Sequence, residues 1–301
     1  MIIQSGFSIL AVVTLLPVSG IFFEAQSQPS AKAACVGMAY GSVRPIVRVM
    51  VNGEGPFRFL IDTGGDGEAR IDIKLVKKLH LQPLGRVMNN DSTKKNSQAV
   101  DVVELKELEL GSLSFRNVKA MARDYGQSFD GILAFNLFKD KLLTLDYPHK
   151  RVFVSTGYLS RKNSLTMEVP EGTPVILGRL GNERLKIDVD SGDSEFLTVP
   201  KDLSNKLTFS EEPKVIGHGR SATHEYDVKE GRIKESLHLG TETISSPKVV
   251  VSEIFSNVNI GSPLLSQYQV SFDQKRNLMR LSKSEKPACP VNDDKTSTGR
   301  P

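Results

Sequence analysis

The chain has 301 residues, of which 24 are glycine and 15 are proline, and a formal net charge of +4. This length is enough to bury two modest hydrophobic cores. The positive charge is spread along the sequence without interleaved aromatic residues, so the composition gives no support for nucleic-acid binding. Short apolar runs separated by Gly, Asn and Pro turns predict mainly β structure with a few short helices.

The N-terminal segment 1–33 is predicted to be a targeting signal rather than part of the fold. An uncharged apolar run from Phe7 to Phe23 precedes small-residue cleavage sites around Ala31-Lys32-Ala33-Ala34. We therefore expect export, to a periplasm or out of the cell, and no membrane contact after cleavage. No Lys or Arg precedes the run, so an uncleaved anchor is the alternative, although an apolar run of this length is at the short limit for spanning.

The first half of the chain contains a predicted hairpin that leads into an acidic turn. Its strands, Pro45–Gly53 and Phe57–Ile61, end at Asp62-Thr63-Gly64. A polar hairpin at about 87–102 follows. Farther along come Asp130-Gly131-Ile132-Leu133-Ala134 and a strand ending at Asp146.

The second half repeats this pattern after a polar linker near 155–164. Predicted strands from Pro174 lead into Asp190-Ser191-Gly192, and later strands end at Gly261 and Asp273. The spacings agree: Pro45 to Asp62 is 62 − 45 = 17 residues and Pro174 to Asp190 is 190 − 174 = 16. Asp62 to Asp146 is 146 − 62 = 84 and Asp190 to Asp273 is 273 − 190 = 83. The chain is therefore an internal duplication, with short helices expected at 72–80, 134–139, 201–207 and 263–267.

The matched acidic turns predict a site with two carboxyl groups. Two carboxylates in contact cannot both ionise, so such a pair shares one proton and divides into an acid and a base. The simpler interpretation is that each Asp side chain only forms a hydrogen bond with the backbone of its own turn. That interpretation explains one turn well and a matched pair poorly.

These residues, from about Tyr40 to Leu281, resemble the pepsin-like and retropepsin-like aspartic proteases in their two-lobed single-chain form. The resemblance implies an all-β fold with two similar β-barrel lobes, 34–160 and 161–283, and an active site in the cleft between them. The polar composition of the tail over 284–301 predicts disorder. It implies catalytic Asp62 and Asp190, with Thr63 and Ser191 hydrogen-bonded beneath them and Gly64 and Gly192 permitting the tight turns. It also implies a monomer that cleaves peptides or proteins without a metal or cofactor.

Several residues depart from the family pattern. Gly65 and Asp193 follow the two glycines where a hydroxyl or Ala is usual, and Asp188 stands where the first half has Leu60. The extra carboxylates Asp188 and Asp193 are expected to raise the pKa values of the pair. Ala134 replaces a glycine, and the hairpin at 87–102 has no Gly or Tyr near its tip. Two functions therefore stay open: an aspartic endopeptidase, and a catalytically silent relative that binds peptides.

The two cysteines, Cys35 and Cys289, are near opposite ends of the chain. In an exported protein an isolated pair favours a disulfide, and the resemblance places both termini in the sheet between the lobes. The alternative is two free thiols in the tails. The five histidines match no common metal-binding spacing, and the segment from Asp188 to Val199 lacks the ligands of an EF-hand loop.

Overall fold

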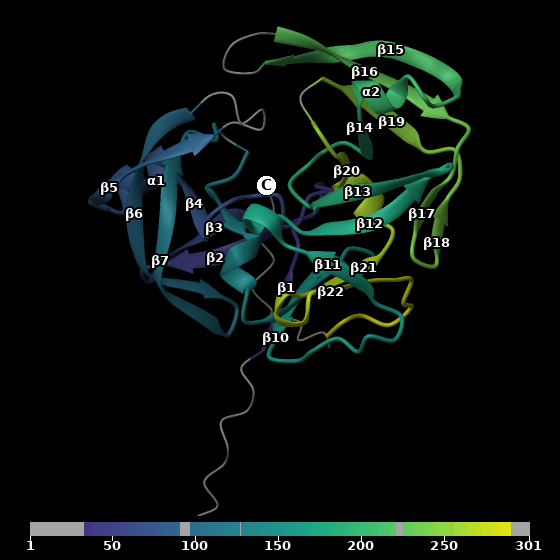
Figure 1. Cartoon of the computed structure of the whole chain (residues 1–301). Coiled ribbons are helices and arrows are strands. Elements are labelled where there is room, and N and C mark those ends of the chain that lie inside the picture. The colour runs from purple at the N-terminus through teal and green to yellow at the C-terminus, as the bar shows by residue number, and fades with distance from the viewer. Residues whose placement is uncertain (1–32, 91–96, 127, 221–224, 254, 290–301) are drawn as a thin grey trace, which may run out of the picture. The chain divides into compact units, whose positions relative to one another are not determined.

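A computed structural model describes residues 33–90, 97–126, 128–220, 225–253 and 255–289. The first half folds into a closed barrel of six strands, because β2 pairs with β6 as well as with β3 (Figure 1). A seventh strand, β5, extends β6 outside the barrel as a hairpin. In sheet order the strands are β2 (Ile46–Val51), β3 (Glu54–Asp62), β8 (Gly131–Ala134), β4 (Ala69–Asp72), β7 (Leu113–Arg123), β6 (Ser97–Leu110) and β5 (Pro83–Asn90).

The second half has the same strand order with two strands interrupted. The position of β6 is divided between β16 and β17, and that of β7 between β18 and β19; β17 then makes the pairing with β12. Pro247 accounts for one interruption, since it has no N–H for a sheet. The strands are β12 (Val175–Leu180), β13 (Glu183–Asp190), β20 (Val258–Gly261), β14 (Leu197–Pro200), β19 (Lys248–Ser252), β16 (Glu225–Ile233), β15 (Phe209–Arg220), β17 (Leu237–Leu239) and β18 (Glu242–Ile244).

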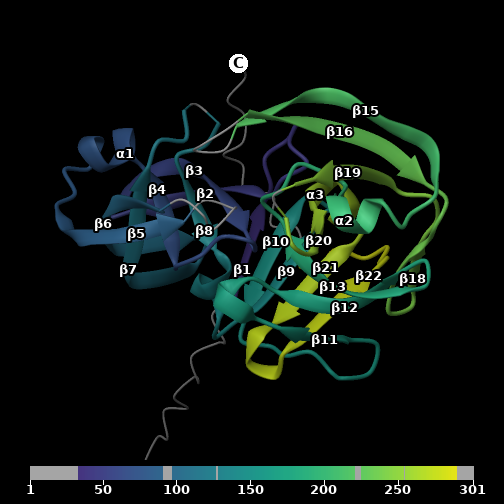
Figure 2. The same cartoon turned by 45° about the horizontal axis from the view of Figure 1, so that its top comes forward.

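A further group of strands joins the two halves. β9 pairs directly with β21, its counterpart in the repeat (Figure 2). Leu143, Leu145, Val270 and Phe272 on these strands are fully buried in the main core. The predicted all-β fold class is confirmed. This group comprises β1 (Ala34–Gly37), β10 (Arg151–Ser155), β9 (Leu142–Asp146), β21 (Gln269–Asp273), β22 (Leu278–Ser282) and β11 (Leu165–Glu168).

The described helices are all short, as expected. Each of the four predicted segments overlaps one helix, which is shorter than the predicted range, and the last, Ser262–Leu265, begins one residue before its range. Asp72 begins the first by accepting a hydrogen bond from the N–H of Lys74. The helices are α1 (Ile73–Lys78), α2 (Lys201–Ser204) and α3 (Ser262–Leu265), with 3₁₀ turns η1 (Phe135–Phe138), η2 (Pro170–Gly172) and η3 (Gln274–Arg276).

A disulfide between Cys35 and Cys289 joins the two ends of the described chain, with Cα atoms 6.1 Å apart. The first residues of the expected tail are held beside it: the N–H of Ala288 donates to Asp146 at 2.7 Å, and Arg151 donates to the carbonyl of Cys289. Residues 290–301 and the expected signal at 1–32 lie outside the described residues. A disulfide indicates an oxidising compartment. In the described part of the chain, no helix has the length and apolar character needed to cross a membrane.

Replacing Cys35 and Cys289 together by Ser is expected to lower the free energy of unfolding by about 2–4 kcal/mol. The bond joins residues separated by 254 positions and therefore restricts a long loop of the unfolded chain. Urea denaturation measures the loss. Reductant should shift the midpoint of the unmodified protein and leave that of the double variant in place. Equal midpoints for the two oxidised proteins would contradict the prediction.

Candidate active site

The two acidic turns lie at equivalent ends of β3 and β13. Each strand runs parallel to its neighbour, so that Asp62 is opposite Ala134 on β8 and Asp190 is opposite Gly261 on β20. The main chain holds each carboxyl group: Oδ1 of Asp62 accepts from the N–H of Gly64 at 3.0 Å, and Oδ1 of Asp190 accepts from that of Gly192 at 2.7 Å. The duplicated sequence thus folds into two matching turns, in each of which the main chain holds the Asp carboxyl group by a hydrogen bond.

Thr63 and Ser191 connect the two turns through four hydrogen bonds. Each hydroxyl accepts from the main-chain N–H of the other residue, at 2.9 and 3.0 Å. Each also donates to the carbonyl that precedes the opposite Asp: Thr63 to Val189 and Ser191 to Ile61, both at 2.7 Å. Both side chains are fully buried. These reciprocal bonds fix the two turns against each other from below.

Gly64 and Gly192 bring each turn against the opposite carboxyl group. A Cβ atom on Gly64 would lie 2.5 Å from Oδ2 of Asp190, and one on Gly192 would lie 2.5 Å from Cγ of Asp62. Neither glycine has a positive φ. A left-handed backbone conformation is therefore not what requires glycine at these two positions. They are needed for space, since a side chain would occupy the volume of the carboxyl group across the interface.

The pKa of Asp190 is raised well above its ordinary value. Burial is the largest cause, followed by the negative charges of Asp62 and Asp193, and a hydrogen bond to Asp62 also raises it. The N–H of Gly192 acts in the opposite direction. The two carboxyl groups are therefore close enough to share a proton.

Asp190→Asn is expected to stabilise the protein at neutral pH. Because the folded pKa is raised, ionisation of Asp190 removes stability as pH rises through that pKa, whereas below the unfolded value of about 3.9 both states keep the proton. The amide retains Oδ1 for the N–H of Gly192. We expect the unfolding midpoint of the variant to exceed that of the unmodified protein at pH 7 and the two to converge below about pH 4. The exposed Asp202→Asn is the control, and a difference independent of pH would contradict the prediction.

Asp193 turns its carboxyl group toward its own lobe. Its Oδ1 accepts from the N–H of Glu195 at 3.0 Å and its Oδ2 from the amide of Asn259 at 2.6 Å. Burial raises the pKa of Asp193, and its charge acts on Asp190. In the first lobe a Cβ on Gly65 would lie 3.2 Å from Cγ of Asp62, so the equivalent position has little room for a side chain.

Asp188 lies on β13 two residues before Asp190 and is half-buried. Its Oδ1 accepts from the amide of Asn257 at 3.0 Å. An effect of Asp188 on the pair's pKa values stays a prediction.

Asp146 and Asp273, which occupy equivalent positions in the two halves, form structural hydrogen bonds. Asp146 accepts from His149 Nδ1 at 2.8 Å, and Asp273 accepts from the N–H of Leu159 at 2.9 Å.

Sequence reasoning missed a group of side chains beside Asp62. Tyr125 and Phe129, 5.0 Å apart by ring centroids, cover a small apolar cluster that contains Leu60. The N–H of Tyr125 is fixed by Asp72 at 2.8 Å. Its hydroxyl is buried beside the guanidinium of Arg70, and no described group forms a well-aligned hydrogen bond with it. The available signal was two aromatic residues, Tyr125 and Phe129, within the five positions before Asp130-Gly131.

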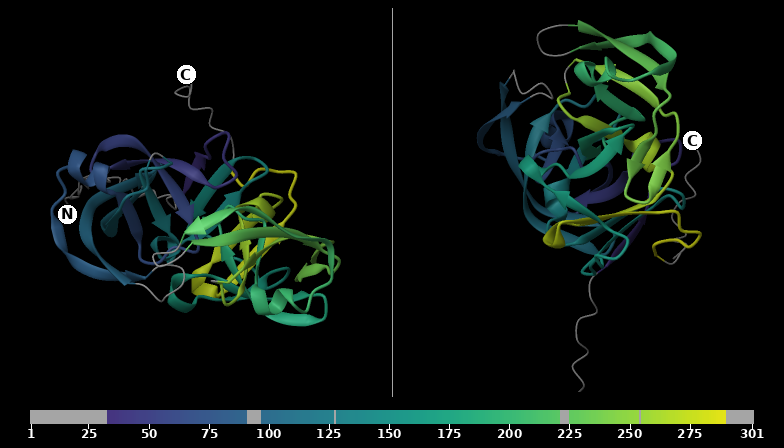
Figure 3. Two further views of the ribbon diagram at one scale, coloured as in Figure 1. Left: turned by 90° about the horizontal axis from the view of Figure 1, so that it is seen from above. Right: turned by 45° about the vertical axis from the view of Figure 1, so that its right-hand side comes forward.

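Each half has a long hairpin, formed by β5 with β6 in the first half, where the polar hairpin at about 87–102 was expected, and by β15 with β16 in the second (Figure 3). Gly217-His218-Gly219-Arg220 lies within β15, and the tip of the second hairpin at 221–224 is outside the described residues. A hollow of about 500 Å³ adjoins the first hairpin, lined among others by Arg86, Val100 and Tyr125. The first hairpin therefore contributes to a cavity that reaches the aromatic group beside Asp62.

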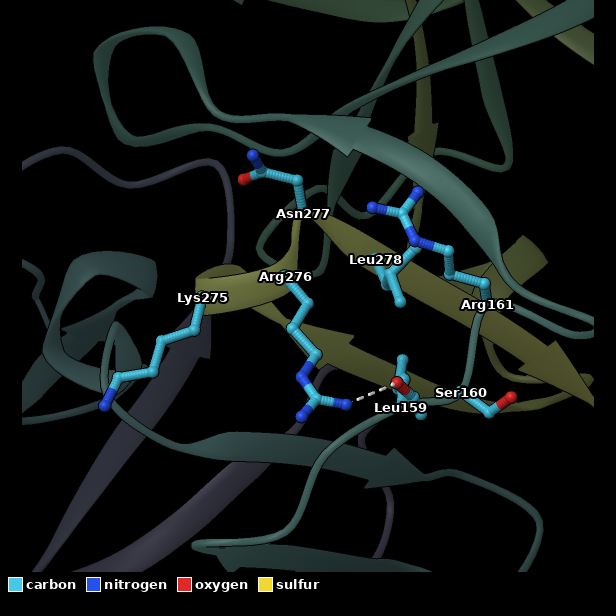
Figure 4. Close-up of a pocket in the computed structure, with 7 residues that line it drawn as sticks. All are labelled: Leu159, Ser160, Arg161, Lys275, Arg276, Asn277 and Leu278. Carbon is cyan, nitrogen blue, oxygen red and sulfur yellow. Dashed lines mark hydrogen bonds between the residues drawn. The ribbon is translucent and has the colours of Figure 1, made fainter.

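A second hollow of about 500 Å³ lies between the linker and η3 (Figure 4). Arg276 donates to the carbonyl of Leu159 there, and Arg161 and Lys275 also line it. No predicted site residue lines this hollow. In the residues that the structure describes, no cluster of three or more His, Cys, Asp or Glu side chains is arranged to hold a metal ion.

Residues 47–137 match the family model described as aspartyl protease. The matched segment extends from β2 into η1, so it includes the Asp62 turn and the first hairpin. No curated protein matches the chain in sequence. The Asp190 turn lies beyond the matched segment, and its likeness to the Asp62 turn rests on the internal repeat.

Proposed function

We propose, from the membership of residues 47–137 in the aspartyl protease family, that this protein is an aspartic endopeptidase. The observation that carries the proposal is the contact of the Asp62 and Asp190 carboxyl groups between two matching turns. The reciprocal bonds of Thr63 and Ser191 support it, because they hold both carboxyl groups in fixed positions.

In this proposal Asp62 is the carboxylate and Asp190 holds the shared proton. Asp62 removes a proton from a water molecule, whose oxygen forms a bond to the carbon of the peptide carbonyl. Asp190 donates a hydrogen bond and then its proton to the carbonyl oxygen. The resulting diol collapses: the C–N bond breaks, the proton held by Asp62 passes to the leaving amine, and one hydroxyl of the diol returns its proton to Asp190 as the new C=O forms. The raised pKa of Asp190 supports this assignment, because its proton is retained over a wider pH range.

The substrate is a peptide or a protein segment. An oxidising compartment, indicated by the disulfide, supports the proposal of an exported enzyme. We propose that the mature enzyme begins near Ala34 and acts as a monomer.

The test is cleavage of a diverse peptide pool by the purified, oxidised protein between about pH 3 and pH 8. Mass spectrometry identifies the products. Cleavage that disappears in the presence of a diol-type or statine-type peptide analogue supports the proposal. Absence of cleavage across that range, together with measurable binding of the same peptides, would favour the silent peptide-binding function.

A further inference from the structure

A buried tyrosine of the first lobe reaches the acidic turn of the second lobe through a serine. Tyr147 directly follows β9, and its side chain is 1 % exposed. Its hydroxyl lies 3.1 Å from Oγ of Ser262, the first residue of α3. Oγ of Ser262 donates to the carbonyl of Ser191 at 2.7 Å. Ser262 is fully buried as well, so both bonds lie away from solvent.

The direction of these hydrogen bonds follows from the protons that each group carries. A serine hydroxyl has one proton, and Ser262 gives it to the carbonyl of Ser191, which can only accept. The oxygen of Ser262 therefore accepts from the hydroxyl of Tyr147. The carbonyl of Ser191 belongs to the same peptide group as the N–H of Gly192, which donates to Oδ1 of Asp190 at 2.7 Å. Three hydrogen bonds thus lead in one direction from Tyr147 to Asp190.

A chain of hydrogen bonds strengthens its last bond. In a buried site each bond polarises the next, by about 10–30 %. Burial and the negative charges of Asp62 and Asp193 raise the pKa of Asp190, and the N–H of Gly192 opposes them because it stabilises the ionised carboxylate. Burial also raises the pKa of Tyr147, and the charge of Asp190 raises it further. Tyr147 therefore keeps its proton and remains a donor.

The first lobe has no hydroxyl at the equivalent position. Phe135 directly follows β8 as Ser262 follows β20, so its side chain cannot donate to the turn of Asp62. The bond from the main-chain N–H to Oδ1 in that turn is 3.0 Å long, against 2.7 Å in the second lobe. The counterpart of Tyr147 is Gln274, which donates to the main-chain carbonyl of Phe135 at 2.7 Å. The two turns therefore match in backbone but differ in what supports their carboxyl groups.

We propose that Tyr147 is a positioning residue for Asp190 and acts through the hydroxyl of Ser262. This inference rests on the proposed function, in which Asp190 gives up a proton and later recovers it. Between these steps Asp190 is ionised, and the chain strengthens the bond that stabilises the ionised form. The N–H of Asp193 also approaches Oδ1 of Asp190, at 3.2 Å, but from outside the chain. Because Tyr147 is buried, it acts through these bonds and not by contact with a substrate.

The experiment follows the ionisation of the carboxyl pair by carbon-13 NMR in the unmodified protein and in Tyr147→Phe. The pair loses its two protons in two steps. We expect the second step to move to higher pH by about half a pH unit in the variant, because the ionised form of Asp190 loses support. The alkaline limb of the pH profile of kcat/KM should move in the same direction, because the singly protonated pair then persists to higher pH.

Two further variants test the route. Ser262→Ala should move the second step at least as far, since the carbonyl of Ser191 then loses its donor. Tyr147→Phe should add nothing in the Ser262→Ala background, because the chain is already broken. Tyr268→Phe is the matched control: this tyrosine is also fully buried, but its hydroxyl meets Glu242 instead. It should leave both ionisation steps in place.

The outcomes separate this inference from the proposed function. An unchanged second step in Tyr147→Phe would overturn the inference, whether or not the protein cleaves peptides. An equal shift in Tyr268→Phe would also overturn it, because a general loosening of the core would then be the cause. If no peptide is cleaved but the second step shifts in Tyr147→Phe alone, the endopeptidase is contradicted and the positioning of Asp190 is supported.

Discussion

Asp62→Asn and Asp190→Asn are each expected to lower kcat/KM for peptide cleavage by about 10³-fold or more. An amide at position 62 cannot accept the proton of the attacking water. One at position 190 cannot donate and recover the shared proton in the same way. Because each carboxyl group depends on the other, the double variant should lose little more than either single one.

This non-additivity separates a reacting pair from two independent contributions. Independent sites would multiply their losses, giving about 10⁶-fold for the double variant. The exposed Asp202→Asn should retain full activity, and circular dichroism should show an unchanged fold for every variant. Cleavage that persists in both single variants would remove the pair from the mechanism.

The sequence was sufficient to predict the duplicated fold because the repeat is recognised from residue patterns that are local in the chain. The spacing from each predicted hairpin to its acidic turn, and onward to Asp146 and Asp273, is nearly the same in both halves, and strand alternation is a local property. Asp72 likewise marks the start of α1 by its capping preference. The predicted helices were longer than the observed ones because short segments carry few turns of periodic pattern.

The parts of the site that were not predicted depend on contacts distant in sequence. Glycine is required at position 64 because the carboxyl group of Asp190, 190 − 64 = 126 residues later, occupies the space that a side chain would fill. This contact exists only in the folded protein, where the two turns meet. Asp193 was expected to raise the pKa values of the pair, and its charge does raise that of Asp190. The contacts with Asn259 and the N–H of Glu195, which turn its carboxyl group toward its own lobe, were not predicted. Tyr125 joins the site through Asp72, which holds its N–H from 125 − 72 = 53 residues earlier.

Gly192→Ala is expected to lower kcat/KM by about 10²-fold, since displacing a reacting group by about 1 Å has that effect. The new methyl group would lie 2.5 Å from Cγ of Asp62, so either the carboxyl group or the turn must move. Overpacking of this kind also costs about 1–3 kcal/mol of unfolding free energy. Gly64→Ala should behave alike, because its methyl group meets Asp190. The control is Gly37→Ala on β1, where a Cβ meets nothing within 4 Å.

A double-variant cycle on stability distinguishes a need for space from a need for backbone freedom. If the clash with Asp62 is the cause, Asp62→Ala creates room, and Gly192→Ala should then cost less in that background, with a coupling of about 0.5–3 kcal/mol. If the turn itself needed glycine, the cost would be the same in both backgrounds, because Asp62→Ala does not change the φ of residue 192. Urea denaturation of the four proteins measures the coupling. A coupling near zero would restore the conformational explanation, whereas a positive one means that the glycine after Ser191 and the Asp of the opposite turn are kept together by their contact.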